Sequence, residues 1–512
     1  MFEGRSLTEP FSKQTNFDDF VNLLASLKGF FSVIHQTNDE VYLAVDHVRS
    51  IPIFYTLGRE VYVSDDPHWI RESIDDASPE RLTATEFLFT GYVTGEETLF
   101  PHIKQLQAAE AVAIRNFENP KKTSIRYVDF QAENIDEEQI GQLVEQSDEP
   151  LNAAFTRLIR FANGRTIVVP LSGGLDSRMI LLMLKRIGYD RITTFSNGRR
   201  NNREARVSRT VASALGLPWH FVEYSNKLWR RWFNSKEWNE YTHYANGLSS
   251  TPYVQDWPAI MELRKNYAVP TGSVFVPGHA AWHVGFHPRF PAKRPVSGHG
   301  CDDDLTSLEV FEGFYELQTF RRLDPSIQDL LTRRIRTLLT ASSTNATADA
   351  ANFFDLFWWT EYAAKFTINS VRAYEFFDYA WWVPLWDMDL VRFWMKVPRA
   401  YRQERMFNRL CAQRIETIVT GRRPMEDTSP IKPYSGIGLL LRKAHLLSAA
   451  LTVRSFADYY KHPYAWNSII PKNEYYHMYR GIENINSYLA TQTIKQFFPK
   501  SDVESMDTIS VK

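Results

Sequence analysis

Residues 166–187 read TIVVPLSGGLDSRMILLMLKRI, and they predict a strand, a loop and a helix in that order. The β-branched run Thr166–Val169 is typical of a buried strand. The apolar segment Met179–Ile187 has the length expected of a helix. The glycine-rich loop between the two carries the polar residues that can bind a ligand.

This loop, Leu171–Ser177, combines two glycines, two serines and one aspartate. A glycine has no Cβ, so backbone N–H groups can approach a phosphate, and Ser172 and Ser177 add hydroxyl donors. The loop also opens a helix, whose N-terminal dipole favours an anion. Asp176 would repel a phosphate unless a Mg²⁺ ion bridges the two. The pattern therefore predicts a phosphate site with Mg²⁺ at Asp176, although a bare SGG would also fit a solvent-exposed turn.

A strand and helix alternation continues after this loop. Ile192–Phe195 predicts a second strand, a helix begins at about Arg203, and His220–Glu223 predicts a third strand. This order is typical of a doubly wound parallel sheet, in which ligands bind at the carboxyl ends of the strands. After about Asp302 the pattern is mostly helical.

The first part of the chain has a different pattern, with short apolar runs separated by turn residues. It predicts consecutive strands. They lie at Gly29–Ile34, Val41–Asp46, Ile53–Tyr55, Val61–Asp65, around Ile103–Gln107 and at Ala111–Ile114. The polar, acidic stretch 131–149 is the expected linker. We therefore expect two domains, residues 1–140 and residues 141–512.

The composition excludes several classes of protein. The 512 residues are 44% hydrophobic and 23% charged, which indicates two or three globular domains. A net charge of -1 gives no broad basic field, so we expect no nucleic-acid partner. Cys301 and Cys411 are too few for a disulfide framework and fit a reducing compartment. No signal peptide and no apolar run of membrane-spanning length is apparent, so we expect a cytoplasmic protein without a membrane span.

The loop resembles the PP-loop of ATP pyrophosphatases, and nearly the whole chain resembles the glutamine-dependent asparagine synthetases. The stretches that carry the resemblance are Gly29–Ser32, Val45-Asp46, Pro52–Tyr55, Ser64-Asp65, Phe195–Gly198, Glu204-Ala205, Pro277–His279 and Pro384–Asp387. The resemblance implies an α/β fold in two parts. The first is an α/β/β/α sandwich of the N-terminal-nucleophile (Ntn) type, and the second is a PP-loop (adenine nucleotide alpha hydrolase-like) domain with a helical C-terminal part.

The resemblance also implies an activity: an ATP-dependent ligase that adenylates a carboxylate, releases pyrophosphate and passes the acyl-AMP to ammonia or an amine. Its cofactors would be ATP and Mg²⁺. Relatives with Pro-Leu-Trp-Asp, as at Pro384–Asp387, suggest that the carboxylate is a sugar acid of a surface polysaccharide. The residues implied to bind ATP and pyrophosphate are Leu171, Ser172, Gly173, Gly174, Leu175, Asp176, Ser177, Phe195, Asn197, Pro277 and Gly278. His279 would face the acyl-adenylate, and Arg402 or Arg405 would replace the family's catalytic lysine, which makes His279 and Arg405 the catalytic candidates.

The chain departs from the family pattern at its N-terminus. The family's glutaminase nucleophile is a cysteine at the mature N-terminus, whereas Phe2 stands at position 2 and Cys301 is the first cysteine. A thiolate is needed to form the glutamyl thioester, so we expect no glutamine hydrolysis. The N-terminal domain would be structural, and ammonia would come free or from a separate glutaminase.

A second departure affects the family signature Ser-Gly-Glu-Gly-Ala-Asp-Glu. Its best match is Pro277–His283, where Trp282 and His283 replace two acids. A competing register at Ser297–Asp304 restores the acids, including Asp302, but no strand precedes it. Ala380 and Trp382 likewise replace a glutamate and an arginine of a later signature.

These losses leave alternatives open. One is a pseudoenzyme that keeps the nucleotide loop and acts as a binding or assembly partner. Another is a ring-closing ligase, which also lacks the glutaminase cysteine. The histidines at 279, 283, 287 and 299 admit a zinc site, but no HExxH glutamate accompanies them, so ordinary core or surface histidines are favoured.

Overall fold

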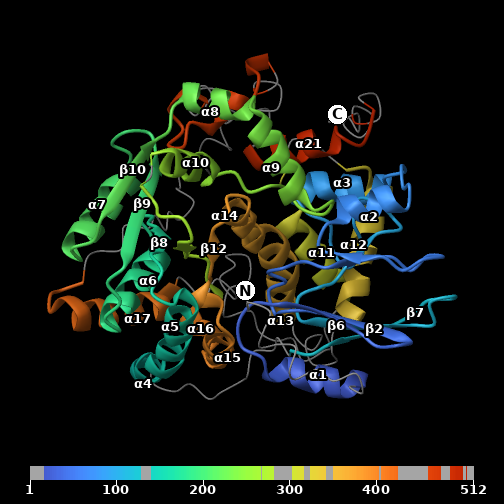
Figure 1. The fold of residues 1–512 in the computed structure, drawn as a ribbon, viewed down its shortest axis with the longest axis horizontal. Helices are drawn as coiled ribbons and strands as arrows, with labels where there is room; N and C mark the ends of the chain where they lie inside the picture. The colour runs from blue at the N-terminus through green and yellow to red at the C-terminus, as the bar shows by residue number, and fades with distance from the viewer. Residues whose placement is uncertain are drawn as a thin grey trace.

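The computed structural model describes residues 16–128, 140–266, 268–281, 303–315, 317, 323–341, 350–402, 405–424, 459–473, 475, 485–499 and 503. Within these ranges the chain is mixed α/β, with antiparallel sheets in its first part and a parallel sheet in its second (Figure 1). The second signature's alternatives, Trp282 and Asp302, lie outside the described residues, as do Phe2, Cys301, His283, His287 and His299.

The N-terminal part holds two antiparallel sheets. The larger has the order β1-β2-β6-β7 and the smaller β4-β3-β5. Their strands are β1 (Ser32–Gln36), β2 (Glu40–Val45), β3 (Phe54–Tyr55), β4 (Val63–Ser64), β5 (Lys104–Gln105), β6 (Glu110–Arg115) and β7 (Lys121–Arg126). The predicted strand regions are confirmed, whereas β7 was not predicted, because its KKTSIR sequence is polar and mostly exposed. The helices of this part are α1 (Phe17–Ser26), α2 (Pro67–Ser73) and α3 (Arg81–Thr90).

The second part contains the predicted parallel sheet. Its order is β10-β9-β8-β11-β12, and every neighbouring pair is parallel. The strands are β8 (Ile167–Pro170), β9 (Ile192–Gly198), β10 (Trp219–Glu223), β11 (Val274–Phe275) and β12 (Ala380–Trp381). The strand order reverses between β8 and β11, and in open α/β sheets ligands bind at such a point, beyond the carboxyl ends of the strands.

Helices surround this sheet (Figure 1). They are α4 (Ile140–Gln146), α5 (Asp148–Ala162), α6 (Leu175–Arg186), α7 (Arg203–Ala214), α8 (Asn226–Phe233), α9 (Lys236–Asn246), α10 (Trp257–Lys265) and α17 (Met406–Thr420). Asp148 joins three of them, because its carboxylate accepts hydrogen bonds from Arg186 of α6 at 3.0 Å and Arg414 of α17 at 2.6 Å. The expected linker 131–149 is corrected in its second half, since α4 and the start of α5 lie there and bury Leu143 and Val144.

Apart from β12, the regular elements of the C-terminal part are helical where it is described, which agrees with the prediction of a mostly helical segment. Its elements are α11 (Asp303–Phe314), α12 (Pro325–Ala341), α13 (Ala350–Phe357), the π-helix η3 (Trp358–Thr367), η4 (Ile368–Val371), α14 (Arg372–Glu375), η5 (Pro384–Trp386), α15 (Met388–Lys396), α16 (Arg399–Arg402), η7 (Trp466–Ile469) and α21 (Ile485–Ile494). The last helix, α21, packs against α3 of the N-terminal part (Figure 1). Phe497, just after α21, lies 5.4 Å from the ring of Phe100, and Arg71 lies over both rings.

Aromatic side chains join the N-terminal sheets to the parallel sheet. Phe30 lies 4.9 Å from Trp382, which also stacks on Phe161 of α5 at 4.7 Å. His47 Nε2 lies 2.6 Å from the carbonyl oxygen of Trp386, within the Pro384–Asp387 motif. Phe30 and the strands of the parallel sheet belong to one hydrophobic core, so the tryptophans act in packing.

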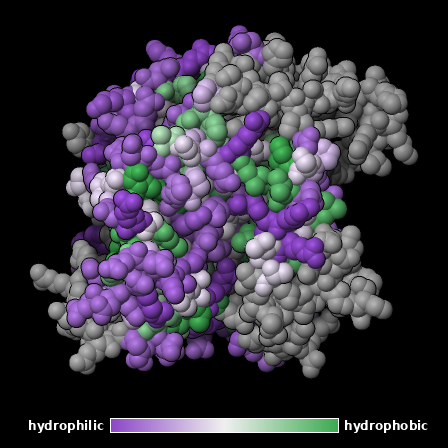
Figure 2. Space-filling view, turned by 90° about the vertical axis from the view of Figure 1, so that its right-hand side faces the viewer, coloured by the Kyte–Doolittle hydropathy of each residue, from purple (hydrophilic) through white to green (hydrophobic). Residues whose placement is uncertain are grey.

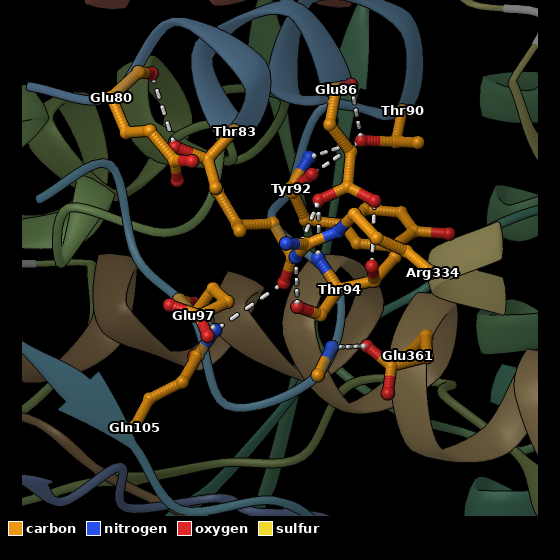
Figure 3. A network of polar contacts seen from close by, with 12 residues as sticks. Glu80, Thr83, Glu86, Thr90, Tyr92, Thr94, Glu97, Gln105, Arg334 and Glu361 are labelled. Atoms are coloured by element: carbon orange, nitrogen blue, oxygen red, sulfur yellow. Dashed lines mark hydrogen bonds and ion pairs between the residues drawn. The ribbon is translucent and has the colours of Figure 1, made fainter. Parts of the chain in front are cut away.

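A buried polar network forms a second junction (Figure 3). Glu86 of α3 is fully buried, and its carboxylate accepts hydrogen bonds from the hydroxyls of Thr94 and Tyr315, both at 2.6 Å. Arg334 of α12 lies 3.3 Å from the same carboxylate. The charge is therefore paired and hydrogen-bonded by residues far apart in sequence, as a buried carboxylate requires.

A second buried carboxylate, Glu361 of η3, holds the same segment of chain. It accepts a hydrogen bond from the backbone N–H of Gly95 at 3.0 Å and pairs with Lys365 Nζ at 2.6 Å. Lys365 also donates to the carbonyl oxygens of Val93 and Gly95. Burial lowers the pKa of Lys365 from its usual value, while the Glu361 carboxylate opposes that shift.

One face of the molecule shows how polar and apolar residues are distributed over the surface (Figure 2). On the face drawn in Figure 2, hydrophilic residues predominate and hydrophobic patches are separated from one another. Among the helices in the described ranges, none combines the length and the apolar character needed to cross a bilayer.

Candidate active site

A cavity of about 180 Å³ lies at the carboxyl ends of β8, β9 and β11. Its walls come from six separate stretches of the chain, which meet only in the folded protein. The residues that line it are Pro170, Leu171, Ser172, Asp176, Ser177, Phe195, Ser196, Asn197, Glu204, Tyr253, Gln255, Asp256, Pro277, Gly278, His279 and Tyr464. This is the place where the strand order reverses, and it brings together nine of the residues singled out from the sequence: Leu171, Ser172, Asp176, Ser177, Phe195, Asn197, Pro277, Gly278 and His279.

The loop after β8 is held in shape by its own serines. Ser177 Oγ accepts a hydrogen bond from the backbone N–H of Ser172 at 3.1 Å and lies 3.1 Å from Ser172 Oγ. The N–H of Gly174, at the N-cap of α6, donates to Ser172 Oγ at 3.1 Å. Asp176 and Ser177 lie in the first turn of α6 and line the cavity. The positive end of the α6 dipole is therefore at the cavity, where it favours an anion.

Gly278 forms the facing wall and packs directly on this turn. A Cβ added at Gly278 would lie 3.0 Å from the backbone nitrogen of Ser177 and 3.5 Å from Asp176 Cβ. At these distances a side chain could be accommodated only if one of the two walls shifted by a few tenths of an ångström. The close approach of the two backbones therefore favours glycine at this position.

Three loop residues expected in the nucleotide site do not line the cavity: Gly173, Gly174 and Leu175. The side chain of Leu175 is buried in the hydrophobic core. A Cβ at Gly173 would meet only ordinary contacts of 3.6 Å, to Glu204 and Val207 of α7. Packing within the protein therefore does not explain this glycine, and the conformation of its backbone does not require one.

Arg405, the other expected catalytic residue, is not among the described residues that line the cavity. Arg405 is the left-handed residue (φ 55°) before α17. Arg402 is also elsewhere: its side chain is buried and donates to the carbonyl oxygens of Val397 at 2.7 Å and Met395 at 3.2 Å. Burial lowers the pKa of Arg402 to about 10. It binds the carbonyls at the end of α15, a structural role.

His279 does reach the cavity and has a defined partner there. Its Nε2 lies 2.6 Å from Ser370 Oγ of η4. Its ring lies edge-on to that of Tyr253, with ring centroids 6.5 Å apart. These contacts hold the imidazole at the wall formed after β11.

Sequence reasoning missed Asp256, which precedes α10 and lines the same cavity. Its side chain is 6% exposed. One carboxylate oxygen accepts a hydrogen bond from Asn197 Nδ2 at 3.2 Å, and the other from the Tyr374 hydroxyl at 3.0 Å. Burial raises the pKa of Asp256 above its usual value. The polar pair Gln255-Asp256 before a proline-containing helix start was the only local signal, and it identifies no site by itself.

The charges on the described walls are mostly negative. Asp176, Glu204 and Asp256 line the cavity, whereas its described lining includes no lysine or arginine. Glu204 accepts a hydrogen bond from the Tyr464 hydroxyl at 2.6 Å. Burial, together with the Glu204 carboxylate, raises the pKa of Tyr464.

The donor set fits a hard cation such as Mg²⁺. Asp176, Ser172 and Ser177 supply oxygen atoms, which Mg²⁺ prefers. Within the described ranges no three His, Cys, Asp or Glu side chains lie close enough together to hold a metal ion by themselves. Mg²⁺ commonly keeps several waters and binds one or two carboxylates together with substrate phosphates, so Asp176 would suffice on the protein's side.

Comparison with known families identifies the central part of this site. Residues 157–230, from α5 to α8, match the family model described as asparagine synthase. The chain therefore contains an asparagine synthase domain over the segment that holds β8, the serine-glycine loop, β9 and β10. The comparison with curated proteins found no match.

Two solved structures are similar to the chain at a low level. One is the NH3-dependent NAD synthetase from Campylobacter jejuni subsp. jejuni NCTC 11168 in complex with the nitrate ion, at 15% identity and a TM-score of 0.21, covering 39% of this chain and 95% of that one. The other is the glutamine-dependent NAD+ synthetase from Acinetobacter baumannii in complex with adenosine diphosphate, at 11% identity and a TM-score of 0.19, covering 66% of this chain and 87% of that one.

Proposed function

We propose that this protein is an AMP-forming ligase of the asparagine synthase type, which adenylates a carboxylate with ATP and forms an amide with ammonia or an amine. The observation that carries the proposal is the meeting of Asp176, Ser177 and Gly278 at the carboxyl ends of β8 and β11. Asp176 and Ser177 lie inside the segment 157–230 that matches the family model, and Gly278 packs on them from outside it. A helix N-terminus, two hydroxyls and a carboxylate at such a point suit a metal-bound polyphosphate.

Each part of the loop has a task in this proposal. Ser172, Ser177 and the first turn of α6 bind the phosphates, and Gly173 and Gly174 leave space for them. Asp176 holds Mg²⁺, which neutralises phosphate charge when bound. Leu171, Asn197, Pro277 and Gly278 frame the adenosine, with Phe195 beside them. Leu175 contributes to this arrangement only through its place in the core.

The rest of the reaction needs an activated acyl group and a dry site. Attack of the substrate carboxylate on the α-phosphorus of ATP makes an acyl-AMP, and pyrophosphate leaves. His279 lies on the wall where the acyl group would be, held by Ser370. Enclosure of the mixed anhydride keeps water from competing with the nitrogen nucleophile. The carboxylate is proposed to be a small molecule or a sugar acid.

We propose no glutaminase activity for this chain. Cys411, a free cysteine among the described residues, is buried in α17, and burial raises the pKa of its thiol to about 12. A thiol in that state is not a nucleophile near neutral pH. Ammonia would come free or from a separate glutaminase, and residues 1–140 would form a structural Ntn-type domain attached to the synthetase domain 141–512. A cytoplasmic location fits this activity.

The test is calorimetric titration of ATP, with and without Mg²⁺, into wild type and the Asp176→Ala variant. We expect Mg²⁺-dependent binding to wild type that the substitution abolishes. Asp190→Ala is the matched control, because Asp190 follows α6 at its other end and its side chain is 86% exposed. Wild-type protein that binds no ATP would rule the proposal out.

A second candidate, a pseudoenzyme that binds nucleotide and serves as an assembly partner, is favoured by Trp382. This residue stands where the family has an arginine, and it packs between Phe30 and Phe161 at the junction of the two parts. Pyrophosphate release on screening carboxylates with ammonium would favour the ligase. ATP binding without release for any carboxylate would favour the pseudoenzyme.

A further inference from the structure

We propose that Asp256 binds the nitrogen donor as a cation, either ammonium or a primary alkylammonium, and accepts one of its protons. The inference rests on the proposed function, because it assigns a substrate and a role within the same cavity. It concerns a residue outside the nucleotide loop, on the segment that leads into α10.

The first observation is the charge of the cavity. Its described lining carries three carboxyl groups, on Asp176, Glu204 and Asp256, and no lysine or arginine. Mg²⁺ and the phosphates account for Asp176, which lies in the loop. Glu204 lies at the entrance to α7 and is 2.6 Å from the Tyr464 hydroxyl. Asp256 remains as a carboxyl group that neither the phosphates nor the metal requires.

The second observation is the environment of Asp256. The side chain is almost fully buried, and the two groups that donate hydrogen bonds to it, Asn197 Nδ2 and the Tyr374 hydroxyl, are neutral. A buried carboxylate is costly unless a cation or several hydrogen bonds compensate it. A substrate cation supplies this compensation, and Tyr253 on the same wall offers an aromatic ring of the kind that attracts ammonium groups.

The third observation concerns proton transfer. Ammonium has no free electron pair, so it must lose a proton before it can attack the acyl carbon. Burial raises the pKa of Asp256, which makes its carboxylate a better proton acceptor than an exposed aspartate. Asp256 therefore lies in the cavity and has the proton affinity that deprotonation of ammonium requires.

The step balances as follows. One N–H bond of ammonium breaks as an O–H bond forms on Asp256, and the freed electron pair of nitrogen attacks the acyl carbon. The C–O bond to the phosphate then breaks, and AMP leaves with that electron pair. A second proton leaves the nitrogen for water as the amide forms. No oxidant or further reactant is needed.

The experiment uses rubidium ion as the probe, because Rb⁺ resembles ammonium in size and can be located by anomalous scattering. Crystals of the full chain with Mg²⁺ and ATP are soaked in rubidium chloride, and competition is tested with ammonium chloride. We expect an Rb⁺ peak in contact with the Asp256 carboxylate that ammonium displaces. Glu204→Gln is the matched control and should keep the Rb⁺ peak. Asp256→Asn should lose the peak, but its Kd for ATP in the presence of Mg²⁺ should stay within about threefold of the wild-type value.

Each outcome separates this inference from the proposed function. Absence of an Rb⁺ peak at Asp256 in wild type overturns the inference, as does a peak that persists in Asp256→Asn. A large loss of ATP affinity in Asp256→Asn also overturns it, since Asp256 would then belong to the nucleotide site. A wild-type chain that binds Rb⁺ at Asp256 but no ATP would instead refute the ligase. If Asp256→Asn does not fold, the wild-type competition by ammonium still decides, and a peak that ammonium cannot displace overturns the inference.

Discussion

Substituting alanine for Gly278 should weaken nucleotide binding strongly while leaving the fold intact. The added Cβ would lie 3.0 Å from the backbone nitrogen of Ser177, 3.4 Å from its Cβ and 3.5 Å from Asp176 Cβ. The atom nearest to the new methyl group is backbone, which cannot rotate away as a flexible side chain can. The two walls of the cavity must therefore move apart.

The size of the effect follows from these distances. Non-bonded heavy atoms are most stable at about 3.5–4.0 Å, so the wall after β11 must retreat from α6 by roughly 0.5 Å. Overpacking of this kind costs about 1–3 kcal/mol. If nucleotide binding requires the native spacing of the walls, the same strain returns on binding, and Kd for ATP should rise about 5- to 150-fold. In the free protein the walls can move apart and relieve part of the strain. We expect Tm to fall by about 2–4 °C for each kcal/mol of strain that is not relieved.

The assay is calorimetry of ATP with Mg²⁺, together with thermal unfolding of the free protein. Gly141→Ala in α4 is the control, because a Cβ there meets nothing within 4 Å. That variant should bind as wild type does and gain about 0.5–1 kcal/mol of stability, since alanine is favoured over glycine in a helix. A Gly278→Ala protein with wild-type affinity and wild-type Tm would refute the reasoning about the close approach of the two walls.

Two further substitutions test the loop and the helices around it. In Gly173→Ala the nearest contacts of the new methyl group are 3.6 Å long, so Tm should not change. The methyl group would take space that a phosphate needs, and Kd for ATP should therefore rise at least about tenfold. An unchanged Kd by calorimetry would indicate that the loop is a plain turn. Burial opposes ionisation of Asp148, but hydrogen bonds from two arginines outweigh it and lower the pKa. Because the folded-state pKa is depressed, this stability is present above the unfolded value of about 4 and is lost as pH falls through the folded one. Asp148→Asn should therefore lower the free energy of unfolding in urea by about 1 kcal/mol at pH 7, a difference that shrinks near pH 3, and equal stability at pH 7 would contradict the ion-pair argument.

Much of the fold could be predicted because its signals are local. The parallel strands are β-branched and bounded by turn residues, and the loop at Ser172 stands between a strand and a helix. Where residues are polar, as in β7, or where a helix begins in an acidic stretch, as in α4, the pattern gives no such signal. The division at residue 140 and the Ntn-type sandwich stay predictions.

The site was predictable only where a motif marks it. Ser172, Asp176 and Gly278 belong to recognisable stretches, and the fold brings them to one cavity. Asp256 comes from an unmarked loop and reaches the cavity through contacts with β9 and α14, which only the three-dimensional structure reveals. Arg405 was suggested by the resemblance, but it is not among the described residues that line the cavity, and its catalytic role stays a prediction.

The packing of α21 against α3 constrains how the chain folds during synthesis. Phe100 and Arg71 emerge from the ribosome about 400 residues before Phe497, the ring that completes their packing. Until then, the surface of α3 that α21 covers stays exposed to solvent and to other nascent chains. Contacts of such high sequence separation slow folding and leave aggregation-prone intermediates. A premature stop near residue 480 should therefore affect the first quarter of the protein, whose own sequence would be complete.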